Sequence, residues 1–210
     1  MSPRVADPGV RSALIAAATR LLADGGPGEL SARRLAAEIG ASTMRIYTHF
    51  ANMDDLHAAV RREGFARLAA AVQDAGGSDD PVADLGAAGV AYLDAARAEP
   101  GLYRAMFNHR PPPGDDAGRP LFDLLAGAVR RCVDGGRFGA DPARISAWAG
   151  ELWAALHGLV TLALAGMLAP EALDFLFADS LRRFAIGFGD DPEAARRSID
   201  GAAALTRRSR

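Results

Sequence analysis

The sequence predicts an all-α protein with a small N-terminal head and a larger helical body. Apolar residues recur every three or four positions along most of the 210-residue chain, which is the period of a helix. Alternating runs of Val, Ile, Thr and aromatic residues, which indicate strands, are nearly absent. Half of the chain is hydrophobic, which excludes a disordered protein and allows a substantial core. We expect about nine helices in total.

Three short helices are expected to form the head, residues 1–52. An apolar stripe predicts a helix over residues 10–24, which a Gly/Pro-rich segment then ends. Ser31 is suited to cap a second helix that stops at Gly40, and Ser42 is suited to cap a third.

A fourth helix is expected to connect the head to the body over residues 53–76. Asn52 followed by Asp55 resembles a capping box at its start. The body, residues 77–189, is expected to contain the remaining helices. The tail, residues 190–210, is expected to be polar and frayed or to form a short terminal helix. The helices expected in the body lie near 81–97, 99–107, 120–135, 142–168 and 170–188.

The charge distribution gives a modest hint of a nucleic-acid partner for the head. The net charge of the whole chain is −2, and every basic residue is an arginine. Residues 1–62 hold eight arginines against six Asp and Glu, so this part is positive by two charges. Ordinary solvated helices explain this excess equally well.

No metal, cofactor or disulfide is expected. Cys132 is the single cysteine, which excludes an intramolecular disulfide and zinc-finger spacing, and its helical context indicates a packed thiol rather than a redox sensor. The four histidines are scattered and share no cluster with Asp or Glu, so we expect no metal site.

Two features bear on localisation. The N-terminus lacks the apolar core of a signal peptide, so a cytoplasmic protein is expected. Residues 152–169 are eighteen long and mostly apolar, at the lower limit for a membrane span. We favour burial by protein over a membrane anchor, because the stretch holds His157 and Thr161 and no basic cluster marks one end.

Residues 31–50 carry most of the functional information. They predict two short helices joined by a tight turn, the layout that places a recognition helix in the major groove of DNA. At 100° per residue, Ile46 and Phe50 face inward while Met44 and Thr48 face outward. The helical period alone leaves open whether this outer face is simply solvated.

The outward side chains suit the chemistry of a DNA contact. Arg45 can bind guanine through two hydrogen bonds, and Thr48 and Met44 can touch a thymine methyl group or exclude wrong bases. Tyr47 and His49 are long enough to reach phosphate, as are Ser31 and Arg33 from the preceding helix. The full set of candidate DNA contacts is Ser31, Arg33, Ser42, Thr43, Met44, Arg45, Tyr47, Thr48 and His49.

Residues 10–58 resemble the N-terminal DNA-binding domain of the TetR family of transcriptional regulators. The resemblance rests on Leu30-Ser31, on Ile39 to Ser42 at the turn, and on Ile46-Tyr47-Thr48-His49-Phe50, which fits the Leu-Tyr-x-His-Phe end of that family's recognition helix. It implies that Tyr47 and His49 contact or frame the DNA backbone. It also implies that bases are read by Thr43 to Arg45 and by Thr48.

Two positions depart from the family pattern. Met53 stands where the family commonly has a phosphate-binding Lys, and Met44 stands where Gly or Pro is frequent. The loss of one phosphate contact predicts weaker binding to DNA with a flatter salt dependence.

The body is similar to a TetR subgroup named for a Trp-His-Gly signature. The similarity rests on residues 99–107 and on Trp153, His157 and Gly158, and it implies a ligand-responsive dimerisation domain. Trp153 and His157 share one helix face. An alternative is that His157 is simply a core imidazole. The candidate effector pocket, for a small and largely apolar molecule, is Tyr103, Met106, Phe107, Trp153 and His157.

The last two body helices have more apolar surface than one small body easily buries. Pairing them with a second copy gives a four-helix bundle, and a two-fold dimer presents two recognition helices to a palindromic operator. We therefore expect a homodimeric, effector-released repressor. The alternatives are an activator with the same head and a helical enzyme that uses His157. The candidate dimer interface is Leu152, Leu156, Leu159, Val160, Leu164, Phe177, Leu181, Phe184 and Phe188.

Overall fold

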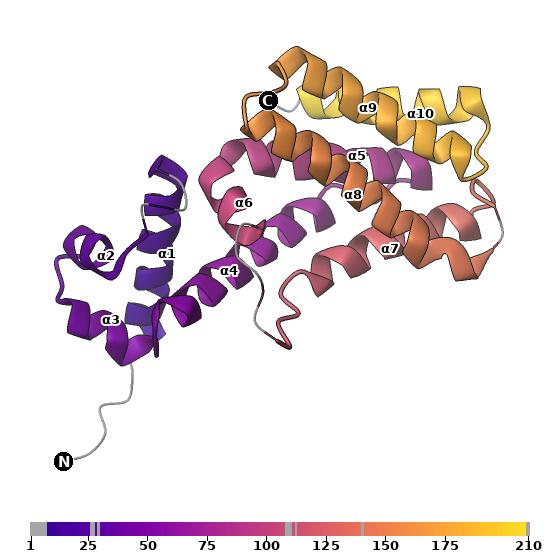
Figure 1. Ribbon diagram of the computed structural model, residues 1–210. Helices are drawn as coiled ribbons and strands as arrows, with labels where there is room; N and C mark the ends of the chain where they lie inside the picture. Colours follow the sequence, from indigo (N-terminus) through magenta and orange to yellow (C-terminus); the bar gives the residue numbers. More distant parts are fainter. Residues whose placement is uncertain are drawn as a thin grey trace. The chain divides into compact units, whose positions relative to one another are not determined.

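The computed structural model describes residues 8–25, 28, 30–107, 111, 113–139 and 141–208. Within these residues the protein contains ten α-helices and no β-strand (Figure 1), which confirms the predicted all-α fold. The helix in excess of the expected nine is α10 (Pro192–Arg208), where a frayed tail or a short helix was expected. Its buried Ala195, Ile199 and Ala202 make it part of the core.

The chain divides into two compact units. The head unit comprises Met1–Ala66 and Glu99–Ala117, and the body unit comprises Arg67–Ala98 and Gly118–Arg210. This division differs from the boundaries expected from the sequence in two places. The segment 99–117 belongs to the head unit rather than to the body, and residues 190–210 belong to the body unit rather than to a separate tail.

The head unit contains α1 (Pro8–Gly25), α2 (Ala32–Glu38), α3 (Thr43–His49), the first part of α4 (Met53–Gln73) and α6 (Pro100–Phe107). Helix α1 packs against both α2 and α6, and α2 packs against α3. Arg61 of α4 donates to the carbonyl oxygen of Met106 at 2.9 Å and also pairs with Asp115. The largest fully buried side chains of this unit are Leu14, Leu22, Leu35, Ile46, Phe50 and Leu56.

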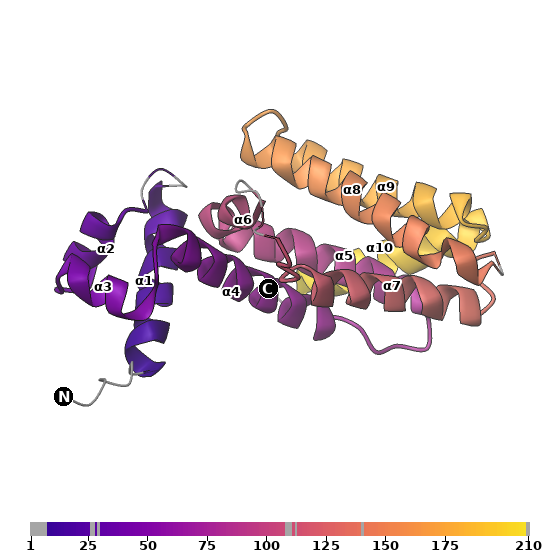
Figure 2. The same ribbon diagram turned by 60° about the horizontal axis from the view of Figure 1, so that its bottom comes forward.

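Helix α5 (Pro81–Ala98) lies at the centre of the body unit. It contacts α7 (Arg119–Asp134), α8 (Ile145–Leu164), α9 (Pro170–Gly187) and α10. Small residues allow this close packing, because a Cβ at Gly86 would lie 3.0 Å from Ile199 Cδ1 and one at Gly89 would lie 3.0 Å from Leu181 Cδ1. Helices α8 and α9 run side by side in both views (Figures 1 and 2).

A polar cluster holds the start of α5 to α10 and to the loop after α7. Arg137 forms a two-bond pair with Asp190 at 2.7 and 2.8 Å and also donates to Asp80 at 2.8 Å. The Ser198 hydroxyl donates to the second oxygen of Asp80 at 2.6 Å. Burial raises the pKa of Asp80, but the Ser198 hydrogen bond, two backbone N–H groups and the Arg137 charge outweigh it, so the pKa lies below its usual value.

The apolar stretch 152–169 does not form one continuous helix. Helix α8 ends at Leu164, because Gly166 adopts a φ of 75° and the Ala165 and Gly166 N–H groups close the last turn. With the preceding 3₁₀ turn, Pro142–Leu164 is the one described helix long and apolar enough to cross a membrane, and 28% of its most apolar window is buried. A single such helix is weak evidence for a span.

Candidate DNA-binding surface and ligand cavity

The turn between α2 and α3 forms as the sequence predicts. Ser31 caps α2 by accepting a hydrogen bond from the Arg34 N–H at 3.3 Å. The chain reverses through Gly40, whose φ of 62° favours glycine, and Ala41 N–H closes the turn onto the Ala36 carbonyl at 2.9 Å. Ser42 begins α3 with an extended backbone, but its side chain makes no capping hydrogen bond.

The buried and exposed faces of α3 match the predicted orientation. Ile46 is fully buried, and Phe50 at the end of the helix is 1% exposed. The opposite face is open, with Met44 74% exposed and Tyr47 48% exposed. Of the other candidate contacts, Arg33, Ser42, Thr43, Arg45 and Thr48 are exposed, and Ser31 and His49 are half-buried.

In two of the candidate contacts, Thr48 and His49, one polar group is already hydrogen-bonded or buried. The Thr48 hydroxyl donates to the Met44 carbonyl oxygen at 3.0 Å. The Nδ1 atom of His49 is buried and has no hydrogen-bond partner among the described residues. A phosphate contact by His49 must therefore use Nε2.

Contacts with α1 and α4 hold α3 in place. The Arg11 guanidinium lies 4.7 Å from the centre of the Phe50 ring, a cation–π contact. The predicted capping box at the start of α4 is present, with Asp55 N–H donating to Asn52 Oδ1 at 2.8 Å and Ala51 N–H donating to the Asp55 carboxylate at 3.2 Å. These contacts hold the C-terminal end of α3, and the turn that Ala41 N–H closes onto the Ala36 carbonyl holds its start.

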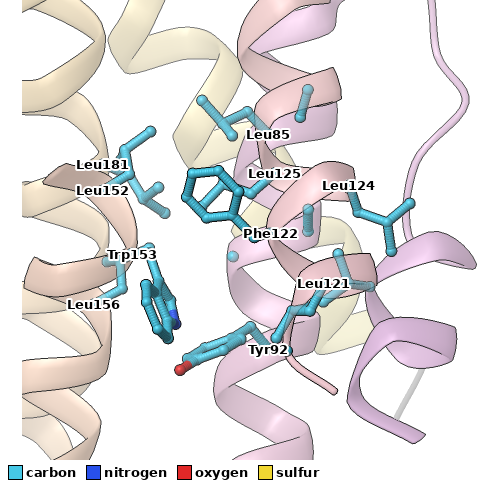
Figure 3. A pocket seen from close by; sticks show the side chains of 15 residues that line it. Leu85, Tyr92, Leu121, Phe122, Leu124, Leu125, Leu152, Trp153, Leu156 and Leu181 are labelled. Atoms are coloured by element: carbon cyan, nitrogen blue, oxygen red, sulfur yellow. The ribbon is translucent and has the colours of Figure 1, made fainter. Parts of the chain in front are cut away.

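The body unit contains an apolar cavity of about 60 Å³ (Figure 3). Charged side chains are absent from its lining, and the polar side-chain atoms there are the Tyr92 hydroxyl and the Trp153 indole nitrogen. Figure 3 shows Phe122 between the leucines of α8 and α9 and those of α5 and α7, with Trp153 close to Tyr92. The lining residues with large side chains are Val72, Leu85, Tyr92, Leu121, Phe122, Leu124, Leu125, Leu152, Trp153, Leu156 and Leu181.

One of the five predicted pocket residues lines this cavity. Trp153 does so, and its ring centre lies 6.0 Å from that of His157, which is outside the lining. Burial lowers the pKa of half-buried His157, which lies 3.4 Å from the Thr161 hydroxyl. The three predicted residues of α6 do not line this cavity: Tyr103, Met106 and Phe107 belong to the head unit, where Phe107 packs edge-on to Phe65 at 5.4 Å.

Sequence reasoning missed the α5 and α7 walls of the cavity. Tyr92 is the single tyrosine of α5, and Leu121, Leu125 and Ala128 form one stripe of α7. The sequence of α7 predicts that this stripe is buried. It does not predict the cavity beside the stripe, because a cavity depends on how well residues from several helices fill the space between them.

The predicted dimer interface also needs a correction. Six of its nine side chains are buried within a single copy of the chain, so they cannot supply a surface for a partner. The exposed large apolar side chains of this region lie elsewhere: Trp153 and Leu162 on α8, Met167 after it, and Phe175 and Ile186 on α9. The six buried residues are Leu152, Leu156, Val160, Phe177, Leu181 and Phe188.

The remaining chemistry of the described residues is structural. Cys132 is buried, its thiol lies 3.3 Å from the Pro81 carbonyl oxygen, and burial raises its pKa to about 12. No group of three His, Cys, Asp or Glu residues in this part of the chain has the arrangement to hold a metal ion.

Two family models match the chain. The one described as "Bacterial regulatory proteins, tetR family" matches residues 14–60, and "Tetracyclin repressor-like, C-terminal domain" matches residues 85–184. The HTH-type transcriptional regulator Rv0681 of Mycobacterium tuberculosis is 29% identical over an alignment of 208 residues, which covers 93% of this chain and 86% of that protein.

Solved structures share the fold. A protein of unknown function from Rhodococcus sp. RHA1 is 30% identical with a TM-score of 0.75, over 86% of this chain and 96% of that one. A TetR variant from Acinetobacter baumannii AYE, solved in complex with minocycline, is 22% identical with a TM-score of 0.64, over 87% and 96% of the two chains.

Proposed function

The chain belongs to the TetR family of bacterial transcriptional regulators, and we propose that it is a homodimeric repressor released from a palindromic operator by a small, largely apolar effector. The observation that carries the proposal is the division of α3 between a buried face at Ile46 and an open face that offers Arg45, Tyr47 and Thr48. Such a face, held at both ends, can enter the major groove. A regulator of this kind acts in the cytoplasm.

Exposed apolar residues on α8 and α9 support a homodimer. Phe175 is 64% exposed, and Ile186 and Leu162 are also open to solvent. The exposed positions Ala147 and Ala154 of α8 and Ala165 directly after it are small, so a second copy can approach this helix closely. Two such helix pairs form an isologous four-helix bundle. The bundle would bring two α3 helices to half-sites about one DNA turn, roughly 34–36 Å, or more apart.

The cavity supports a neutral, apolar effector. An uncompensated charge is costly in a lining without charged side chains, whereas a hydrocarbon or aromatic group fits it. The cavity of about 60 Å³ is smaller than the roughly 150 Å³ that admits benzene in an engineered core. A ring-sized effector must therefore push the walls apart, and Trp153, 36% exposed, can move.

Movement of the walls offers a route to release from DNA. Val72, in the last turn of α4, lines the cavity, and the same helix begins directly after the recognition helix. An effector that shifts this end of α4 favours a head position that fits the operator less well. The coupling is reciprocal, so operator DNA weakens effector binding by the same factor. The TetR variant from Acinetobacter baumannii, which shares the fold, was solved with a small molecule bound, and this supports a small-molecule effector here.

We assign the body to the Trp-His-Gly subgroup as part of the same proposal. Trp153, His157 and Gly158 lie on α8, and the Trp153 and His157 rings tilt toward each other. The sequence of this signature supports the assignment.

Selection of bound sequences from random double-stranded DNA tests the proposal. The full chain should enrich a palindrome, and Arg45→Ala should lower affinity by about 5- to 150-fold for each half-site, the range for a two-bond guanine contact, so the losses in the two half-sites multiply for the dimer. Arg130→Ala, which removes an exposed arginine of α7, is the matched control and should leave affinity unchanged. Failure to enrich any sequence, or equal losses in the two variants, would contradict the proposal.

A matched pair of ligands tests the effector class. Naphthalene should bind the full chain in titration calorimetry and lower operator affinity, whereas 2-naphthoate, with the same rings and a carboxylate, should do neither. Binding of naphthalene without any change in operator affinity would reject effector release. A reporter gene behind the selected operator separates a repressor from an activator by the sign of its response.

A further inference from the structure

We propose that Met44 and Thr48 form a methyl-reading patch that recognises the 5-methyl group of thymine, next to a guanine bound by Arg45. The patch is defined as these two side chains of α3. The inference rests on the proposed function and adds the base chemistry of the half-site.

Met44 and Thr48 lie one turn apart on the open face of α3. Residues four apart in a helix are neighbours on its surface. Met44 has the largest exposed fraction, 74%, among the large apolar side chains of the described residues. The core side of the helix is already formed by Ile46 and Phe50, so Met44 does not serve packing within the head unit. Its thioether is available to cover an apolar group of a partner.

The hydrogen bond of Thr48 decides which of its groups meets a base. Its hydroxyl proton is donated to the Met44 carbonyl oxygen at 3.0 Å. With this bond in place the hydroxyl has no proton to donate to guanine N7 or O6, or to thymine O4, and its oxygen can act only as an acceptor, from adenine N6 or cytosine N4. Its γ-methyl group is the group left to make an apolar contact. Thymine is the base whose major-groove edge carries a methyl group.

Arg45 supplies the hydrogen bonds that the patch lacks. It follows Met44 directly and is exposed. Within the described part of the chain it makes no ion pair, so no protein carboxylate competes for its guanidinium. Its fork of donors matches the two acceptors of guanine. The half-site should therefore contain a guanine beside at least one thymine.

Replacement of thymine by deoxyuridine tests the inference, because it removes the methyl group and keeps base pairing. The operator is the palindrome selected by the full chain, and each thymine is replaced in turn. At one or more positions in each half-site, affinity should fall about fourfold, the value of one buried methyl group.

Three variants assign the effect to the patch. Met44→Ala should reduce the deoxyuridine penalty at its position toward onefold. Thr48→Ser keeps the hydroxyl and removes the methyl group, so it should also lose a penalty, whereas the isosteric Thr48→Val should retain it. Thermal melting of each variant checks that the head remains folded.

The possible outcomes distinguish failure of the methyl-reading patch from failure of DNA binding itself. A selected palindrome without any deoxyuridine-sensitive thymine, or with penalties that persist in both Met44→Ala and Thr48→Ser, overturns the methyl-reading patch and leaves DNA binding intact. Loss of affinity in Thr48→Val with retention in Thr48→Ser would show that the hydroxyl reads the base, and also overturns it. Absence of any selected sequence removes both proposals.

Discussion

Helix α3 of the head unit and helix α8 of the body unit both expose apolar side chains. The two helices differ in how much of their surface the core of the protein already covers. Helix α3 has seven residues and one buried side chain, Ile46, so its remaining positions are available for binding. Helix α8 has twenty residues, is apolar on most sides, and buries Leu152, Leu156 and Val160 among others. In α3, polar residues mark the side of the helix that faces away from the core. In α8, the buried and exposed sides are both apolar, so only the packing of the neighbouring helices distinguishes them.

Two phenylalanines of α9, which lies beside α8, sharpen this contrast. Phe177 is 2% exposed and Phe175 is 64% exposed, although they are two residues apart. Phe177→Ala should lower the free energy of unfolding by about 3–5 kcal/mol, the usual cost of truncating a buried phenylalanine. Phe175→Ala should cost the protomer less than about 0.5 kcal/mol. Chemical denaturation at a protein concentration where the chain is monomeric measures both, and similar losses would show that the two faces are wrongly assigned.

A charge at the exposed position tests the proposed partner surface. Phe175→Glu places two carboxylates near the two-fold axis region of the proposed bundle and should convert the dimer to a monomer in sedimentation. Operator affinity should fall by about 100-fold or more, because the second head no longer binds as part of one molecule. Phe175→Leu, which keeps an apolar side chain, should remain dimeric. A dimeric Phe175→Glu variant would move the interface away from α9.

The head could be predicted closely because its signals are local. Ser31, Gly40 and the Asn52–Asp55 pair each act within four residues, so the caps and the turn follow from the sequence alone. The inward direction of Ile46 follows from the helical period. What the sequence did not reveal is that the Thr48 hydroxyl is already bonded and that His49 Nδ1 is buried.

The body was predicted less well because its assignments depend on contacts between distant segments. Leu152 and Leu156 are apolar helix residues, as a partner surface would also require, yet they are buried because α5, α7 and α9 pack against α8. The aromatic residues of α6 resemble a pocket lining, but the segment 99–117 falls in the head unit. The terminal helix α10 is polar by composition, and a buried Ile199 with small neighbours is enough to attach it to α5.

Two serines, at the starts of α2 and α3, are expected to differ by a smaller amount in their contribution to the free energy of unfolding. Ser31→Ala removes the bond to Arg34 N–H and should cost about 1 kcal/mol of stability. Ser42→Ala removes no capping bond and should cost less than about 0.5 kcal/mol. If Ser42 contacts DNA, its replacement lowers operator affinity without lowering the melting temperature. Equal destabilisation by both substitutions would contradict this difference between the two caps.

A further small effect is expected at Asp84 in α5, which accepts hydrogen bonds from the Ser78 N–H at 2.9 Å and the Ser78 hydroxyl at 2.8 Å. Burial raises the pKa of Asp84, but these hydrogen bonds outweigh it and hold the pKa below its usual 3.8. A carboxyl whose pKa is lower in the folded chain adds stability above its unfolded pKa and loses it as the pH falls through the folded value. Unfolding free energy should therefore be flat near neutral pH and decline below about pH 4.

Asp84→Asn separates this carboxylate from the others that protonate in acid. The amide oxygen can still accept from Ser78, so the loss at pH 7 should be no more than about 1 kcal/mol, the difference between charged and neutral acceptors. The decline in acid should become shallower, because position 84 no longer takes up a proton. Ser78→Ala, which keeps the N–H bond and removes the hydroxyl, should give an intermediate slope in denaturation measured from pH 7 to pH 2. An unchanged slope in Asp84→Asn would mean that other carboxylates, such as Asp80 beside Arg137, carry the acid sensitivity of the body unit.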